Sequence, residues 1–231
     1  MEYSKDIAYL ISSERYKLRT NSADSRIRSI GIKNVSLLNK DRTLEECQQE
    51  GATMWYRAPG EDLGDRPFVS AGSPQVHLGH CRGAANHLTA LRIIAEQEAS
   101  FAYMVCEDDV LFHENYSKLV VDYSRHVPDD YDIVWIGYSD PCHTEPSRIN
   151  EYVIKGGFWC MHCYVITPAG ARKVLASLPF NSQIDWWLSK LAVQNTITGY
   201  AFDYWHDELA ESGRCAYRPR GLAYQELLPP E

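Results

Sequence analysis

Three acidic residues stand side by side at Glu107, Asp108 and Asp109, directly after the apolar residues Val105 and Cys106. Adjacent carboxylates repel one another, and a divalent cation is the usual partner that neutralises them. Mg²⁺ or Mn²⁺ held by one or two carboxylates completes its shell with phosphate oxygens and water. Alternation along an extended segment places Glu107 and Asp109 on one side and Asp108 on the other. The triplet predicts a cation site, and the alternative of a solvated acidic turn stays open.

Other chemical motifs in the chain are weaker. Cys160 and Cys163 have the spacing of a zinc or redox pair, but no second pair at ligand spacing accompanies them. Cys163 also falls within an apolar run that is typical of a strand, so we interpret both as buried thiols. The sequence contains neither a Gly-x-Ser-x-Gly elbow nor a Walker-type loop, and serine hydrolase and P-loop chemistry therefore lack support.

The acidic triplet begins where a strand should end. Residues 101–105 form an apolar run that predicts a buried strand, and the regular apolar positions within residues 84–98 predict the clearest helix of the chain. In open α/β sheets ligands gather outside the carboxyl ends of the strands, because loops there can shape a site on a rigid base. We therefore expect the triplet to lie at the ligand-binding edge of a sheet.

Apolar runs and helical periodicities alternate along the rest of the chain. Further helices are predicted within residues 14–30, from Pro168 with Thr167 as its N-cap, and at 184–193. The glycines and prolines of residues 51–79 predict an extended loop. Further strands are predicted at residues 7–11, 35–38, 133–136, 152–154 and 163–166.

Length and composition indicate one globular domain. The chain has 231 residues, no internal repeat and no linker-like segment, and 45% of its residues are hydrophobic. Its net charge of -8 repels polyanions, which argues against nucleic acid or an anionic membrane as a main partner. We find no signal-peptide pattern and no apolar stretch of the ~20 residues that a bilayer requires. Because the 7 cysteines are scattered, we expect a reducing, cytoplasmic location.

Four segments of the chain resemble landmarks of glycosyltransferase family 25, and they occur in the family order. Residues 11–19 match the family's opening Ile-Asn-Leu-Asp-Arg-x-x-x-Arg with both arginines in register, although serines replace its Asn and Leu. Residues 82–88 resemble its Gly-Cys-x-x-Ser-His and keep the histidine. The family's Glu-Asp-Asp-Val is matched by residues 107–110, and its Ala-Tyr-Val-Ile-Ser-x-x-Gly-Ala is similar to residues 163–171.

Two shorter segments extend this resemblance towards the end of the chain. Ile184-Asp185 is similar to an Ile-Asp that precedes a helix in the family, and Pro219 to Gln225 is similar to its closing Pro-x-x-x-x-Gln with one extra residue. The resemblance implies a single GT-A-like, Rossmann-like α/β domain over residues 1–231, with a mostly parallel mixed central sheet flanked by helices. It divides into a nucleotide-sugar half, about 1–140, and an acceptor half, about 141–231.

The activity implied by this resemblance is metal-dependent, inverting transfer of a hexose. The implied donor is a nucleoside-diphosphate sugar, UDP-linked and galactose-like. The implied acceptor is a hydroxyl of a glycan or a glycosylated molecule, and the implied cofactor is Mn²⁺ or Mg²⁺. Inverting transfer needs a carboxylate that deprotonates the acceptor hydroxyl while the departing diphosphate is stabilised.

The resemblance also assigns roles to individual residues. Asp185 would be the general base, beside a Trp186-Trp187 pair that could stack an acceptor sugar; a helix-start acid with two core tryptophans is the alternative. We interpret Arg19 as an ordinary solvated charge. Asp109 and Glu107 would bind the metal, together with His206 from the C-terminal part. The donor pocket would be formed by Ser12, Arg15, His87, Glu107 and Asp108, with a purely structural role for His87 left open.

Two other functions remain open on the sequence. The first is a catalytically idle sugar- or nucleotide-binding protein of the same fold, suggested by Ser12 in place of the family's Asn. The second is a metal-dependent phosphoryl-transfer or hydrolytic enzyme. That enzyme would need further carboxylates near the triplet, and the acids available for recruitment are Asp129, Asp130, Asp132 and Asp140.

Overall fold

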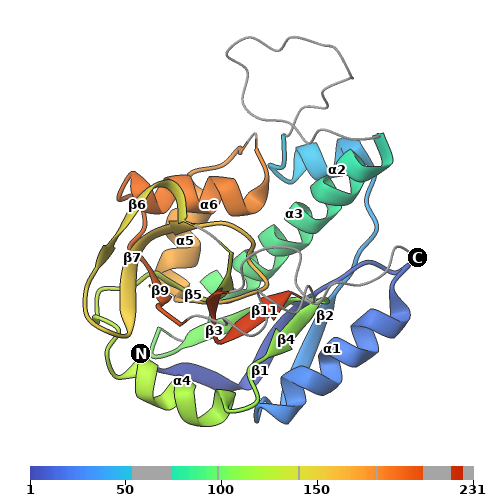
Figure 1. Cartoon of the computed structure of the whole chain (residues 1–231). Coiled ribbons are helices and arrows are strands. Elements are labelled where there is room, and N and C mark those ends of the chain that lie inside the picture. Colours follow the sequence, from blue (N-terminus) through green and yellow to red (C-terminus); the bar gives the residue numbers. More distant parts are fainter. Residues whose placement is uncertain (54–73, 98, 140, 181, 205–219, 226–231) are drawn as a thin grey trace.

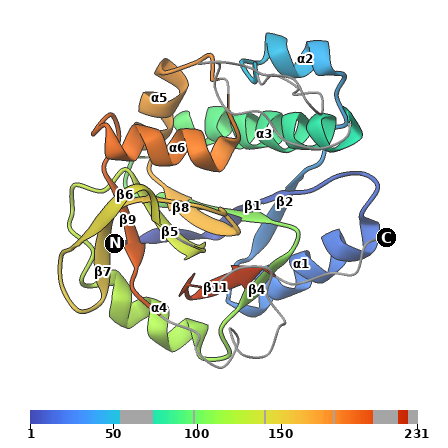
Figure 2. The ribbon, with the colours of Figure 1, turned by 45° about the horizontal axis from the view of Figure 1, so that its top comes forward.

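The structure, a computed structural model, describes residues 1–53, 74–97, 99–139, 141–180, 182–204 and 220–225. The described chain forms a central sheet with helices on both faces (Figures 1 and 2). The strands are β1 (Tyr3–Ile11), β2 (Asn34–Leu38), β3 (Ala102–Glu107), β4 (Val110–Phe112), β5 (Ile133–Tyr138), β6 (Pro141–Arg148), β7 (Val153–Phe158), β8 (Cys163–Ile166), β9 (Gly199–Phe202), β10 (Arg220–Gly221) and β11 (Ala223–Gln225). The helices are α1 (Lys17–Ser29), α2 (Leu44–Gln49), α3 (Pro74–Ala95), α4 (Tyr116–Ser124), α5 (Pro168–Ala176) and α6 (Ile184–Val193).

The central sheet is mixed, and its strand order is β2-β1-β3-β8-β5-β9-β7-β6, with β10 paired to β5. Following the pairings across the sheet, β2, β1, β3, β5, β9 and β6 run in one direction, and β8, β7 and β10 run in the other. The expected α/β class, with a mostly parallel mixed sheet between helices, is therefore confirmed. The separate pair β4 and β11 lies beside this sheet.

Alternating side chains of the buried strands supply two hydrophobic cores. In β1, Tyr9 and Ile11 pack into the core under α2, α3, α5 and α6, whereas Ala8 and Leu10 pack into the core over α1 and α4. Figure 2 shows these two helical layers on opposite faces of the sheet. Successive strand residues point to opposite faces, so a strand buried on both sides must be apolar, as β3 is up to Cys106 and β5 is over its whole length.

The helix α3 begins ten residues before the predicted start at residue 84 and includes the end of the predicted 51–79 loop. Gly79 and Gly83 weaken a helix by sequence propensity, and this led to the wrong boundary. Both glycines lie on the helix face that lines a cavity, together with His87 one turn further on. The missing side chains widen the cavity there. None of the described helices is long and apolar enough to cross a membrane.

Two glycines allow α6 and β11 to pack closely against the central sheet. A Cβ on Gly157 in β7 would lie 2.4 Å from the carbonyl oxygen of Ser189, so α6 packs directly on that strand. A Cβ on Gly137 in β5 would lie 2.5 Å from the carbonyl oxygen of Ala223, so the C-terminal segment also lies against the sheet. These contacts position the start of α6 and the strand β11.

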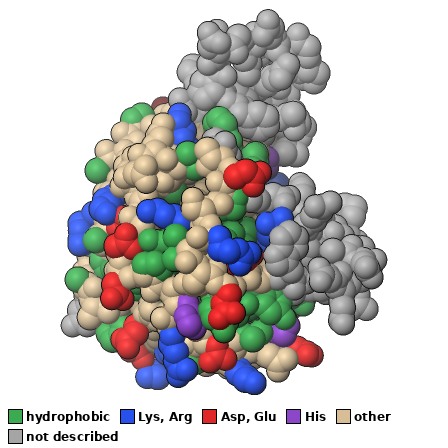
Figure 3. All heavy atoms as spheres, turned by 60° about the vertical axis from the view of Figure 1, so that its left-hand side comes forward, with side chains coloured by type: hydrophobic (Ala, Val, Ile, Leu, Met, Phe, Trp, Pro, Cys, Tyr) green, Lys and Arg blue, Asp and Glu red, His purple; other side chains and the backbone are tan. Residues whose placement is uncertain are grey.

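The face of the molecule on the side of β6 and β7 carries interspersed acidic and basic side chains with small apolar areas between them (Figure 3). No large area of one sign gathers on that face. The concentration of acidic groups that concerns function lies instead at one edge of the sheet.

Candidate active site

The acidic triplet lies at the carboxyl end of β3, as the sequence predicts. Glu107 is the last residue of the strand, and Asp108 and Asp109 form the turn into β4. Ile11 pairs with Glu107 across β1 and β3, which brings Ser12 next to the triplet. The antiparallel neighbour β8 starts at this same edge, so His162 precedes it beside Glu107.

Asp108 ties the turn to the segment after β1. Its Oδ2 accepts a hydrogen bond of 2.6 Å from the Ser12 hydroxyl, and its Oδ1 lies 2.7 Å from a guanidinium nitrogen of Arg19. The interpretation of Arg19 as a solvated charge is therefore wrong, because it is an ion-pair partner of the triplet. Ser12 and Asp108 lie beside each other, whereas Arg15 is exposed on the same loop. A role of these residues towards a nucleotide stays a prediction.

Asp109 is held from the C-terminal strand. The Gln225 side-chain amide donates a hydrogen bond of 2.7 Å to Asp109 Oδ2, and Arg19 approaches the same oxygen at 3.5 Å. Gln225 pairs with Val110 across β11 and β4, and this pairing brings the Gln225 side-chain amide next to the Asp108-Asp109 turn. Gln225 therefore links the C-terminal strand β11 to the acidic turn.

The Glu107 carboxylate is contacted by the buried side chain of His87, which is itself held by the buried hydroxyl of Tyr164. Nε2 of His87 lies 3.4 Å from Glu107 Oε1, and Nδ1 of His87 lies 3.1 Å from the Tyr164 hydroxyl. Burial lowers the pKa of His87 to about 3, so the imidazole is neutral. In the tautomer that satisfies both contacts, Tyr164 donates to Nδ1 and Nε2–H donates to the carboxylate. His87 is thus a buried support for Glu107, and its role in a donor pocket stays a prediction.

Glu107, Asp109 and His162 form a cluster that fits a divalent cation. One ligand atom from each lies within 4.8 Å of the others. Nδ1 of His162 is buried without a hydrogen-bond partner among the described residues and lies 4.0 Å from Glu107 Oε2. Burial lowers the pKa of His162 to about 3, so the ring is neutral and its nitrogen lone pair suits Mn²⁺ or another transition metal.

Electrostatics favour a cation at this cluster. Burial and the nearby charges of Asp109, Asp185 and Asp108 raise the pKa of Glu107 well above its usual value. The raised pKa means that the ionised form of Glu107 is disfavoured here. A bound cation would offset this, because it stabilises the ionised carboxylates. His206, the metal ligand expected from the sequence, lies outside the described residues. The sequence does not predict His162, because nothing local shows that β8 pairs with β3; its position just before an apolar run is the one signal there.

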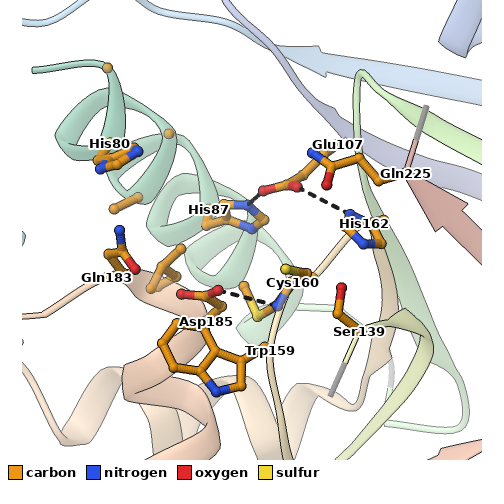
Figure 4. A pocket seen from close by; sticks show the side chains of 15 residues that line it. His80, His87, Glu107, Ser139, Trp159, Cys160, His162, Gln183, Asp185 and Gln225 are labelled. Atoms are coloured by element: carbon orange, nitrogen blue, oxygen red, sulfur yellow. Dashed lines mark hydrogen bonds and ion pairs between the residues drawn. The ribbon is translucent and has the colours of Figure 1, made fainter. Parts of the chain in front are cut away.

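A cavity of about 630 Å³ opens between this cluster and the start of α6 (Figure 4). That volume lies in the range of small-molecule sites. Glu107 and His162 lie on one side of it and Asp185 on the other. The remaining lining residues are Gly79, His80, Gly83, Ala84, His87, Ser139, Trp159, Cys160, Met161, Gln183, Ile184 and Gln225.

Asp185 lies in the first turn of α6 and is held by two backbone amides. The N–H groups of Cys160 and Trp186 donate to its oxygens at 3.2 and 2.8 Å. Burial raises the pKa of Asp185 above its usual value, against the lowering effect of these amides. Cys160 adopts a φ of 58°, a conformation that is uncommon for a residue with a side chain and that aims its N–H at the carboxylate. Asp185 is thus a fixed carboxylate with raised proton affinity.

The two tryptophans after Asp185 do not line the cavity. Trp187 is buried and stacks on Phe180 with ring centroids 4.6 Å apart, which makes it a core residue. Trp186 is half-buried and is not among the cavity-lining residues. The aromatic side chain in the cavity is Trp159, from the loop between β7 and β8. The structure therefore does not place the Trp186-Trp187 pair where it could stack a sugar in this cavity.

Of the additional carboxylates that a phosphoryl-transfer enzyme would recruit, the three that the structure describes do not reach the triplet. Asp132 lies at the amino end of β5, where it contacts Lys173 and the Thr198 N–H, and Asp130 accepts a hydrogen bond from Tyr200. Asp129 is exposed in the same loop, and Asp140 lies outside the described residues. These described acids occupy the sheet edge opposite to the cavity.

Comparison with known proteins returned fold likenesses only. No family model matches the chain, and no curated protein matches it. Among solved structures, the inositol-1-phosphate CTP transferase from T. maritima is 15% identical, with coverage of 86% of this chain and 85% of that one, at a TM-score of 0.42. Mouse xyloside xylosyltransferase 1 in its apo form is 7% identical, with full coverage of both chains, also at 0.42. Residue roles must therefore come from the site itself.

Proposed function

We propose that the protein is a metal-dependent glycosyltransferase that moves a sugar from a nucleoside-diphosphate donor to an acceptor hydroxyl. The observation that carries this proposal is the pairing, across one cavity, of a Glu107-Asp109-His162 cation cluster with a separate carboxylate, Asp185. Sugar transfer needs both a charge that stabilises the departing diphosphate and a base for the acceptor.

The donor would lie at the end of the cavity next to the cluster of Glu107, Asp109 and His162. Glu107, Asp109 and His162 would hold Mn²⁺ or Mg²⁺, and the bound cation would supply positive charge to the diphosphate leaving group. The loop after β1, with Ser12 and the exposed Arg15, would contact the nucleotide. The family resemblance favours a UDP-linked hexose, galactose-like, as the donor.

The acceptor would enter from the side of Asp185. The Asp185 carboxylate would take the proton of the attacking hydroxyl as the new C–O bond forms and the bond from the sugar to the diphosphate breaks. Because base and leaving group lie on different walls of the cavity, this arrangement suits inversion at the sugar carbon. The division at about residue 140 stays a prediction, and the proposed cation cluster spans it through His162.

Nucleotide binding is the first test of this proposal. Thermal unfolding would be measured with UDP-, GDP- and CMP-linked compounds, with and without Mn²⁺, since a bound ligand raises stability by mass action. We expect one nucleotide to stabilise the protein in a Mn²⁺-dependent way. Absence of any nucleotide effect would exclude both the transferase and the idle binder of the same fold.

Turnover is the second test. Release of the free nucleoside diphosphate would be followed with wild type, with Asp109→Ala and with Asp24→Ala, an exposed acid of α1 that serves as a matched control. We expect release to be lost only in Asp109→Ala. Stabilisation by a nucleotide without any release from wild type would identify an idle binder instead.

A further inference from the structure

Trp159 is the one tryptophan among the described residues that line the cavity, and it is firmly placed. Its carbonyl oxygen accepts a hydrogen bond of 3.0 Å from the Ser139 N–H at the end of β5. The next residue, Cys160, donates its N–H to Asp185. Both anchors fix the loop between β7 and β8, so the indole is held half-buried on the same side of the cavity as Asp185 (Figure 4).

Polar side chains that can bind hydroxyl groups line the same cavity as this indole. His80 projects from α3, and Gln183 precedes α6 without making a side-chain cap bond to the helix. Figure 4 shows both on the side of Asp185, away from Glu107 and His162. A cavity wall that offers an aromatic face, a carboxylate, an amide and an imidazole matches a sugar ring, whose apolar C–H face stacks while its hydroxyls donate and accept.

The charge of the cavity restricts the sugar further. The lining residues within the described part of the chain include Glu107 and Asp185 but no lysine or arginine. A carboxylate or phosphate on the ligand would lie beside Asp185 without a basic partner, which disfavours it by like-charge repulsion and lost hydration. The Asp185 end therefore suits an uncharged ring.

We propose that Trp159, Asp185, Gln183 and His80 form an acceptor subsite for a neutral pyranose unit, stacked on the indole with one hydroxyl at Asp185. This inference rests on the proposed glycosyl transfer, because it names the acceptor class of the same site. Trp159 is the specificity-determining residue in it.

The first experiment separates acceptor binding from donor chemistry. Wild type, Trp159→Ala, Trp159→Phe and the neighbouring control Trp186→Phe would be compared for KM of a methyl hexopyranoside acceptor and for donor hydrolysis in its absence. We expect Trp159→Ala to raise the acceptor KM about tenfold, with Trp159→Phe between it and wild type. Trp186→Phe, whose side chain does not line the cavity, should leave the acceptor KM and donor hydrolysis unchanged. Retained Mn²⁺-dependent stabilisation by the nucleotide would show that Trp159→Ala is folded.

The second experiment tests the charge of the acceptor. The methyl hexopyranoside would be compared with the matching uronate and with the matching amino sugar in wild type. We expect the neutral sugar to be used with a kcat/KM at least roughly tenfold above that of the uronate. Equal use of the uronate, or preference for the amino sugar, would overturn the neutral class.

The two levels of the proposal fail in different ways. If nucleotide and Mn²⁺ bind and the donor is hydrolysed, but Trp159→Ala leaves the acceptor KM unchanged, the subsite is wrong and the glycosyltransferase proposal stands. If wild type neither binds a nucleotide nor hydrolyses a donor, the proposed function itself is wrong. Binding of the methyl hexopyranoside to wild type without nucleotide, weakened in Trp159→Ala, would then still identify a sugar site.

Discussion

Acidic residues lie at both edges of the central sheet, but their surroundings differ. At the amino end of β5, Asp132 is buried, Lys173 contacts both of its oxygens at 2.9 and 2.6 Å, and the Thr198 N–H donates to it at 2.8 Å. At the carboxyl end of β3, Glu107 faces Asp109 and Asp185, and these charges together with burial raise its pKa. At the amino end of β5, the negative charge of Asp132 is balanced by Lys173. At the carboxyl end of β3, the acidic side chains outnumber the basic ones that contact them.

This difference separates a structural acid from a binding acid. Asp132 joins β5, α5 and β9 through its partners, so removal of its charge should affect folding. The excess negative charge at the other edge does not stabilise the chain, and a bound cation is the partner that would compensate it. Buried acids without full compensation are therefore a better sign of function than the number of acids in a segment.

The largest expected effect is the loss of turnover in Asp109→Asn. We expect sugar transfer to fall about a thousandfold, because the change removes a cation ligand and roughly 4 kcal/mol of transition-state stabilisation. The melting temperature without metal should change little, while stabilisation by Mn²⁺ and nucleotide should disappear. A variant that retains both the Mn²⁺ response and turnover would show that Asp109 is not part of a cation site.

The opposite edge should show the reverse pattern in Asp132→Ala. We expect about 2 kcal/mol of lost stability, since Thr198 loses its hydrogen-bond acceptor and the half-exposed Lys173 loses its ion-pair partner. That loss corresponds to a fall in melting temperature of roughly 5 °C. Calorimetry and turnover at 20 °C would check it, with Asp24→Ala as an exposed control expected to cost about 0.5 kcal/mol or less. A large loss of turnover at unchanged stability would contradict the distinction between the two edges.

The sequence predicts the acids at the site better than their partners. The triplet is visible because its residues are adjacent and follow an apolar strand, and Asp185 is visible through the family resemblance. The triplet is contacted from distant segments of the chain by Arg19, His162 and Gln225. Tyr164 acts on it only through His87. Their proximity follows from the strand order, which places β8 between β3 and β5 and pairs β11 with β4. No local pattern encodes that order.

Much of the fold could be predicted for the same reason that the triplet could. Buried strands such as β3, β5 and β8 are continuous apolar runs, and Thr167-Pro168 marks the start of α5 by its own chemistry. The short strands β4, β10 and β11 were not predicted, because two or three residues carry no period. The sequence predicts a loop where the early turns of α3 lie, because Gly79 and Gly83, which line the cavity, are poor helix formers.

The support behind Glu107 can be tested with Tyr164→Phe. Loss of the hydroxyl removes the hydrogen bond that fixes the His87 ring, so Glu107 becomes less well oriented. We expect the affinity for Mn²⁺ to fall about tenfold, in the range found when outer partners of metal ligands are removed. Titration calorimetry with Mn²⁺ alone would measure it. Tyr138→Phe, which removes a buried hydroxyl bonded to the Phe202 carbonyl, is the matched control and should leave the Mn²⁺ affinity unchanged.

The smallest expected effect is a displaced acid limb in the pH dependence of kcat. Burial raises the pKa of Asp185, so the protonated, inactive form persists to a higher pH than for an ordinary aspartate near 3.9. We expect kcat to rise with pH through that raised pKa at saturating Mn²⁺. Glu107 and His80 face the same cavity, so Mn²⁺ affinity measured over the same pH range would separate protonation of the cation ligands from that of Asp185. An acid limb that follows Mn²⁺ binding alone would assign the base to another residue.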